Sequence, residues 1–253
     1  MKVVQSIFTE SAGWNTTGDL TTKPQIVLAF SPLELADNRE LYDQLRSRFP
    51  DANLISASTS GDIFKSEVKD NAIVVSGLEF EKTNVKPVEM NIADCTSAFE
   101  LGKSIFKTLN DPELVHILII SDGLQINGSE LVAGLAIGNE KKIPITGGLA
   151  GDNARFIKTI VGLNHFPAPG NVVGIGFYGK HLRVGHGSKG GWDPFGPERV
   201  VTRSDRNILY ELDDQSALEL YKKYLGELSK ELPGSALLFP LTMKIADSDV
   251  PLV

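Results

Sequence analysis

Apolar residues along the first half of the chain alternate between short continuous runs and stretches with helical spacing. The continuous runs are rich in Ile and Val and predict buried strands at 25–30, 53–58 and 115–120. The stretches with helical spacing predict helices at 33–49, 94–109 and 128–138. Since short links join strand, helix and strand over 25–58, this part predicts a right-handed parallel crossover.

Residues at the segment ends predict where these elements start. Ser31 before Pro32 is typical of a helix start, with Ser31 as the N-cap. Asp94 or Thr96 would cap the helix over 94–109. Two further strand-like runs, 71–80 and 83–92, are separated by two charged residues and predict a hairpin.

The second half of the chain is dominated by strand-like runs. We expect consecutive strands at 156–163, 171–179, 181–187, 198–204 and 207–213, then an amphipathic helix at 216–228 and a strand at 236–245. The predicted fold class is therefore α/β. Mixed β-sheets carry flanking helices, and N-terminal βαβ units precede a mostly antiparallel run of strands.

Composition narrows the function classes. The 25 basic and 32 acidic residues give a net charge of −7 with no basic block, which argues against nucleic acid. The longest apolar runs are far shorter than the roughly 20 residues of a membrane helix, and the N-terminus has no apolar signal core. We therefore expect a soluble, cytoplasmic protein. The single cysteine, Cys95, excludes an intrachain disulfide and a cysteine-cluster zinc site.

A glycine-rich stretch at 145–156 contains Gly147, Gly148, Gly151 and Asp152. A dinucleotide fingerprint needs such glycines before a helix, whose N-terminus then binds the phosphates. The residues that follow alternate like a strand, and no P-loop motif occurs in the chain. We therefore expect a tight glycine crossing, with Asp152 placed beside neighbouring turns.

Three aspartates, Asp62, Asp122 and Asp152, adjoin glycines at predicted strand ends, where α/β sheets bind ligands. They favour the polar rim of a ligand pocket. The alternatives are a metal-dependent hydrolase that uses the three carboxylates, or ordinary turn and cap residues. The chain has no G-x-S-x-G elbow and no readable pairing of base and nucleophile. We therefore expect neither an enzyme nor a metal site.

Three further residues could contact a ligand. Trp192, in a turn-rich stretch, could stack on a ligand or cover an edge of the core. His181 and His186 flank a strand–loop segment and are the two histidines to test as haem ligands.

Seven segments in order resemble the FIST family of sensory domains: 25–32, 54–64, 118–135, 143–156, 191–202, 208–226 and 237–241. Among them are a turn with S-T-x-G, an S-D-G segment, G-G-x-A-G-D and a G-W-x-P-x-G loop. Each motif alone is weak, but several in the same order are specific. The resemblance covers nearly the whole chain from about residue 25.

The resemblance implies a non-enzymatic sensor of bacterial signal transduction that binds a small ligand such as an amino acid or related metabolite. It would act on a histidine kinase, a cyclase or phosphodiesterase, or a chemoreceptor module. One branch resembles haem-binding nitric-oxide sensors, which regulate a histidine kinase or a cyclic-di-GMP enzyme, so haem is the alternative ligand. The expected ligand-binding residues are Ser58, Thr59, Ser60, Gly61, Asp62, Ser121, Asp122, Gly123, Asn127, Gly147, Gly148, Gly151, Asp152 and Trp192.

By the same resemblance, we expect an N-terminal strand and loop over 1–24, a ligand-sensing domain over 25–208, and the beginning of a C-terminal part, apparently truncated, over 209–253. The chain departs from the family at one turn. Ser56 and Ala57 stand where the family usually has a cysteine and a glycine, so no role of that cysteine carries over.

Overall fold

The computed structural model describes residues 1–18, 21–187 and 196–244. The chain divides into two compact units, Met1–His186 and Gly187–Val253.

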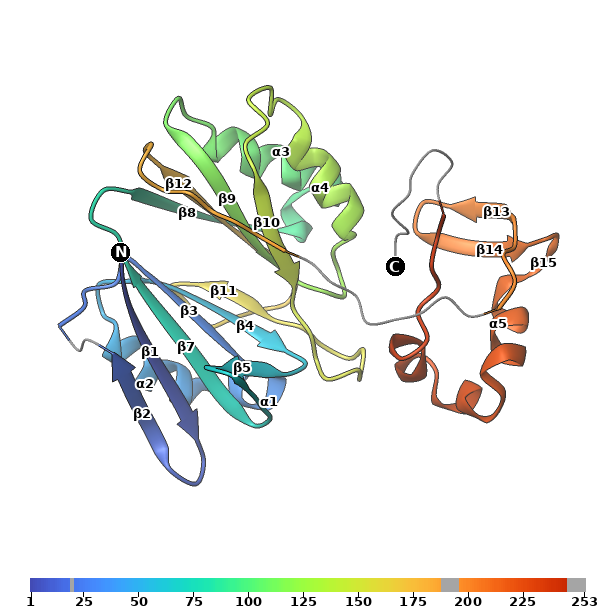
Figure 1. Cartoon of the computed structure of the whole chain (residues 1–253), viewed down its shortest axis with the longest axis horizontal. Helices are drawn as coiled ribbons and strands as arrows, with labels where there is room; N and C mark the ends of the chain where they lie inside the picture. The colour runs from blue at the N-terminus through green and yellow to red at the C-terminus, as the bar shows by residue number, and fades with distance from the viewer. Residues whose placement is uncertain (19–20, 188–195, 245–253) are drawn as a thin grey trace. The chain divides into compact units, whose positions relative to one another are not determined.

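The first unit contains two main sheets (Figure 1). The six-stranded sheet has the order β11 (Val161–Leu163), β4 (Asn53–Thr59), β3 (Ile26–Pro32), β7 (Ala72–Glu79), β1 (Lys2–Thr9) and β2 (Gly13–Gly18). The four-stranded sheet has the order β10 (Ile145–Leu149), β9 (Leu114–Ser121), β12 (Asn171–Tyr178) and β8 (Asn84–Asn91). A small hairpin joins β5 (Asp62–Phe64) to β6 (Glu67–Lys69).

The helices of the first unit cover one face of each main sheet (Figure 1). They are α1 (Leu33–Ala36), α2 (Arg39–Arg48), α3 (Ala98–Leu109) and α4 (Gly128–Ala136). Three hydrophobic clusters fill the layers. One joins α1 and α2 to the six-stranded sheet, and another joins α3 and α4 to the four-stranded sheet. The third contains residues from both sheets and lies between them.

The alternation of side chains along each strand explains why the central strands are apolar throughout. In β3, Val27 packs toward the helices, whereas Ile26 belongs to the cluster between the sheets. In β9, Ile117 likewise packs toward the helices, and Ile120 belongs to the cluster between the sheets. Strands with both faces buried read as continuous Ile and Val runs, which is the pattern of the sequence.

Two strand–helix–strand units supply the parallel pairs. Strand β3 pairs with β4 in parallel across α1 and α2, and β9 pairs with β10 in parallel across α4. The other pairs in the two main sheets are antiparallel. The predicted α/β class, with mixed sheets and flanking helices, is confirmed.

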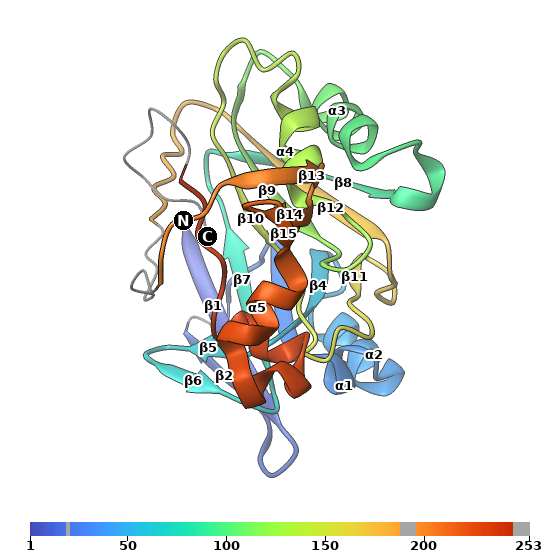
Figure 2. The ribbon, with the colours of Figure 1, turned by 90° about the vertical axis from the view of Figure 1, so that its right-hand side faces the viewer.

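The second unit is small (Figure 2). It contains an antiparallel sheet in the order β13 (Val201–Asp205), β14 (Ile208–Leu212) and β15 (Gln215–Ser216), followed by α5 (Ala217–Leu225). Ser216 caps α5 by accepting a hydrogen bond from the Glu219 amide. Short 3-10 turns follow at Gly226–Glu231 and Gly234–Leu237.

The predicted hairpin over 71–92 is wrong. Strand β7 is bonded by β1 on one side and β3 on the other, so it has no free edge for β8. Strand β8 pairs instead with β12, which lies about 80 residues further along the chain. The alternating pattern identified both strands, but it carries no information about their partners.

Two predicted helix starts are also wrong. Ser31 lies within β3 rather than capping a helix, and the helix expected over 33–49 is interrupted at Asp37 and Asn38. Asn38 then caps α2 by accepting a hydrogen bond from the Leu41 amide. Helix α3 is capped by Ser97, whose hydroxyl accepts from the Glu100 amide, and not by Asp94 or Thr96.

Three predicted strands are shorter or missing. The strand expected at 156–163 begins only at Val161, because the preceding residues form a hydrogen-bonded loop. Residues 181–187 and 236–244 form no strand. Among the described residues, no helix is long and apolar enough to span a membrane.

Candidate functional site

Three turns that follow strands of different sheets come together in the first unit. They span residues 58–62, from the end of β4 to the start of β5, residues 121–125, which begin with the last residue of β9, and residues 150–160 after β10; we call them the loop cluster. The Ala150 amide donates to the Ser121 carbonyl at 2.7 Å, and the Gly151 amide donates to the Ser58 carbonyl at 2.9 Å. The predicted gathering of these turns is therefore present in the structure.

Two buried hydroxyls fasten the end of the third turn to the other two. The Ile160 amide donates to the Ser58 hydroxyl at 3.1 Å, and the Gly123 amide donates to the Thr159 hydroxyl at 3.0 Å. Both hydroxyl-bearing residues are almost fully buried. Hydrogen bonds thus hold the backbone of the loop cluster together.

Asp122 organises the second turn. Its carboxylate accepts hydrogen bonds from the amides of Leu124 (2.8 Å), Gln125 (2.6 Å) and Gly170 (3.0 Å). The side chain is 1% exposed. Both oxygens therefore already have backbone donors.

Asp152 organises the third turn in the same way. Its carboxylate accepts from the amides of Phe156 (3.0 Å), Ile157 (2.6 Å) and Lys158 (3.1 Å). Burial alone would raise the pKa of Asp152, but the backbone donors together hold it below its usual value. The carboxylate is ionised at neutral pH and serves as the centre of the turn.

The turn around Asp152 is conformationally strained. Asn153, Ala154 and Phe156 have φ values of 59°, 63° and 54°, in the left-handed region that residues with a Cβ rarely adopt. Strain of this kind persists where surrounding contacts impose it, and it is concentrated at ligand sites and switches. Here the contacts around the turn include the hydrogen bonds to the Asp152 carboxylate and the bond from the Asn153 amide to the Ser60 hydroxyl.

Asp62 differs from the other two aspartates. One oxygen accepts from the Thr59 hydroxyl at 2.9 Å, whereas Oδ2 is buried and has no hydrogen-bond partner in the structure. The side chain is 3% exposed. Burial, with a smaller contribution from Asp70, raises the pKa of Asp62 to about 6. Asp62 is the one predicted aspartate with an oxygen that no donor occupies.

The glycines of the loop cluster allow backbone segments to approach closely. A Cβ on Gly123 would lie 2.0 Å from the Ala150 carbonyl oxygen, and one on Gly151 would lie 2.4 Å from the Ser60 hydroxyl. On Gly147, in β10, it would lie 1.9 Å from the Ile119 carbonyl oxygen. Gly148 has nothing within 4 Å of that position. The predicted tight glycine crossing is present.

The remaining predicted residues have local roles in the structure. Asn127 caps α4 by accepting a hydrogen bond from the Glu130 amide. The buried hydroxyl of Ser121 donates to the carbonyl of Asp122. Ser60 and Gly61 are exposed, and the Ser60 hydroxyl accepts from the Asn153 amide. Whether any of the predicted residues contacts a ligand stays a prediction.

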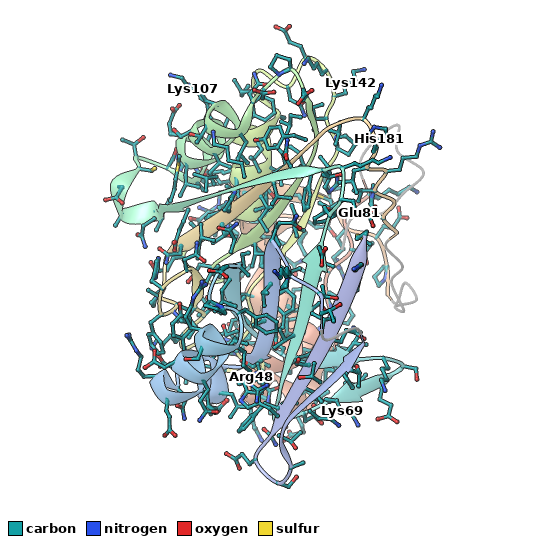
Figure 3. All side chains as sticks on the ribbon, turned by 90° about the vertical axis from the view of Figure 1, so that its left-hand side faces the viewer. Arg48, Lys69, Glu81, Lys107, Lys142 and His181 are labelled. Carbon is teal, nitrogen blue, oxygen red and sulfur yellow. The ribbon has the colours of Figure 1, made fainter. Side chains whose placement is uncertain are left out.

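The histidines do not fit a haem site. His181 and His186 are both exposed, and His181 is visible at the surface in Figure 3. A haem ligand works within a largely apolar enclosure that controls access to the iron. Both side chains are instead open to solvent. Trp192 lies outside the described residues.

The three aspartates do not form a metal site either. Across residues 1–18, 21–187 and 196–244, no three His, Cys, Asp or Glu side chains are grouped so that they could hold a metal ion. The backbone donors on Asp122 and Asp152 explain this. Both oxygens of each carboxylate already accept hydrogen bonds from backbone amides.

Several residues of the loop cluster could not be singled out from the sequence. Thr159 has no motif around it, although its hydroxyl joins two turns. Arg155 donates to the carbonyl of Asp152 and pairs with Glu34 of α1. Phe156 and Ile157 are 42% and 77% exposed. The sequence alone does not show whether an apolar residue in a loop is buried or exposed.

The FIST N domain model matches residues 25–215, which is most of the chain. The chain belongs to the FIST family, whose domains serve as sensors in signal transduction. It is also similar to an uncharacterized protein of Methanocaldococcus jannaschii, with 25% identity over 224 residues. That similarity covers 81% of this chain and 41% of the relative.

Proposed function

We propose that the chain is a non-enzymatic sensory module that binds a small polar ligand at the loop cluster. The observation that carries this proposal is the buried Oδ2 of Asp62, which has no partner inside an otherwise hydrogen-bonded set of turns. Buried polar atoms are normally satisfied, and an exception calls for a functional or structural reason. A donor group of a bound ligand would satisfy this oxygen.

The chemistry of Asp62 favours a ligand with an ammonium or hydroxyl group. An ammonium donating to Oδ2 would form a charge-assisted hydrogen bond, which is stronger than a neutral one. Amino acids and related metabolites carry this group, in agreement with what the family resemblance implies. Gly61, next to Asp62, is exposed and has nothing within 4 Å of its Cβ position, so the turn has room to admit a ligand.

In this proposal, Asp122 and Asp152 shape the site without touching the ligand. Each is almost fully buried, and each accepts three backbone hydrogen bonds. They hold the turns in place, and Ser60 and Asn153, which bond to each other, are exposed beside them. Preorganised turns reduce the entropy that binding costs.

Downstream, occupancy of the loop cluster would alter the affinity for a signalling partner in the cytoplasm. The family resemblance favours a histidine kinase, a cyclase or phosphodiesterase, or a chemoreceptor module. The segment that a ligand could rearrange contains the left-handed residues Asn153, Ala154 and Phe156, next to the exposed Ser60 that bonds the Asn153 amide.

A thermal-shift screen of the protein amino acids tests the proposal. A ligand present at about 100 times its Kd stabilises the folded state by roughly 2.7 kcal/mol and raises the midpoint by several degrees. We expect one chemical class to produce this shift, and Asp62→Asn to reduce it. The exposed Asp51 provides the matched control, so Asp51→Asn should respond like the natural chain. No shift with any amino acid at millimolar concentration would contradict an amino-acid ligand.

A further inference from the structure

Strand β10 has one unoccupied edge. It lies at the end of the four-stranded sheet, and of the strands in the described part of the chain only β9 pairs with it. Gly147, Gly148 and Leu149 are exposed, and Leu149 is 54% exposed. Three of the five residues of β10 are therefore exposed.

The direction of the backbone groups follows from two hydrogen bonds at the ends of β10. The Pro144 carbonyl accepts from the Ile117 amide, and the Ala150 amide donates to the Ser121 carbonyl. Even-numbered residues thus face β9. Because successive residues of a strand point in opposite directions, Ile145, Gly147 and Leu149 direct their N–H and C=O groups outward.

Nothing on β10 protects this edge. Proteins usually block exposed edges with charged side chains, proline within the strand, or a bulge. Residues Ile145–Leu149 contain no charge and no proline, and their pairing with β9 has no irregularity. A Cβ at Gly148 would meet nothing within 4 Å, so another backbone can approach closely there.

The strand is complementary to itself. In an antiparallel register centred on Gly147, Ile145 of one copy lies opposite Leu149 of the other, and Thr146 lies opposite Gly148. The three outward-facing residues then oppose one another as hydrogen-bonded pairs, which gives about six N–H···O=C bonds. Apolar residues face apolar residues, and no like charges meet.

We propose that β10 pairs with β10 of a second copy of this chain, so that the two four-stranded sheets join into one continuous sheet across a twofold axis. We assign the partner strand to a second copy because, in this register, every outward-facing N–H and C=O group of both strands forms a hydrogen bond. The dimer brings two loop clusters close to the same axis.

Sedimentation equilibrium of the full chain tests the proposal. A short paired edge gives weak association, so the concentration should range from about 5 to about 500 µM. The mass should rise from 27.4 kDa toward twice that value. Leu149→Lys places a charge at the edge and should weaken dimerisation by about tenfold or more. Val68→Lys makes the same change at another exposed strand residue and should leave dimerisation unchanged.

Amide hydrogen exchange gives an independent readout that does not depend on a substitution. The amides of Ile145, Gly147 and Leu149 should exchange freely at low concentration and become protected as the mass rises. A chain that stays monomeric over this range would overturn the proposal. So would protection of these amides at all concentrations, which would show that the edge is already covered, or equal effects of Leu149→Lys and Val68→Lys.

Discussion

Replacing Asp62 by asparagine should change how the stability of the protein depends on pH. The pKa of Asp62 is raised from 3.8 to about 6, chiefly by burial. Between these values the folded state binds more protons than the unfolded state, so stability falls as pH rises. The contribution is fully present below pH 4 and is lost above pH 6. A difference of about two pH units corresponds to roughly 3 kcal/mol.

Asparagine has nearly the same shape as aspartate but does not titrate. The natural chain should therefore lose roughly 2–3 kcal/mol between pH 4 and pH 8 that Asp62→Asn retains. Any constant cost of burying the new amide adds equally at both pH values. The comparison isolates the carboxylate because every other titrating group is common to the two proteins.

Urea unfolding at pH 4, 5, 6, 7 and 8, followed by far-UV circular dichroism, measures this difference. The free energy of unfolding of Asp62→Asn minus that of the natural chain should increase from pH 4 to about pH 6 and then level off up to pH 8. The same difference for Asp51→Asn, which changes an exposed carboxylate, is the control. A difference for Asp62→Asn that stays constant over this range would refute the assignment of a buried carboxylate without a partner.

Three further predictions concern stability. Asp152→Ala should cost roughly 2–4 kcal/mol in urea unfolding, because three backbone donors lose a charged acceptor; a loss below 1 kcal/mol would contradict its role. Gly147→Ala should destabilise by about 3 kcal/mol or more, whereas Gly148→Ala should change stability by less than about 1 kcal/mol; equal melting points would show that the close contact is not real. His165 donates to a backbone carbonyl and pairs with Glu89 at 2.6 Å, which raises its pKa. Stability from this pair should be present below pH 6.5 and lost as pH rises through the folded-state pKa; His165→Gln should remove this dependence, and an unchanged pH profile would count against the pairing.

The sequence predicted the parts of the fold that depend on local pattern. Continuous apolar runs identified β3, β4, β9 and β12, because strands buried on both faces need apolar residues at every position. Short links between strand, helix and strand predicted the parallel pairing of β3 with β4.

The sequence did not predict correctly which strands pair when they lie far apart in the chain. Strand β8 follows β7 in the chain yet bonds with β12, because both edges of β7 are already taken. No local pattern records such competition. The interruption of the helix at Asn38 was missed for a related reason, since a capping residue inside a helical pattern is also compatible with an unbroken helix.

The sequence predicted the location of the candidate site more accurately than the role of each side chain in it. Glycine and aspartate at strand ends located the three turns that meet. The sequence could not show that Asp122 and Asp152 bind their own backbone whereas Asp62 has an oxygen without a donor. That distinction depends on where individual amides point after folding.

Binding of a small ligand at the loop cluster is the central claim, and an NMR titration tests it most directly. Isotope-labelled protein would be titrated with each protein amino acid while the backbone amides are observed. If the loop cluster binds the ligand, one class of ligand shifts the amides of residues 58–62, 121–125 and 150–160, and Asp62→Asn reduces the shifts. An absence of shifts at millimolar concentration, or shifts confined to other parts of the chain, would contradict it.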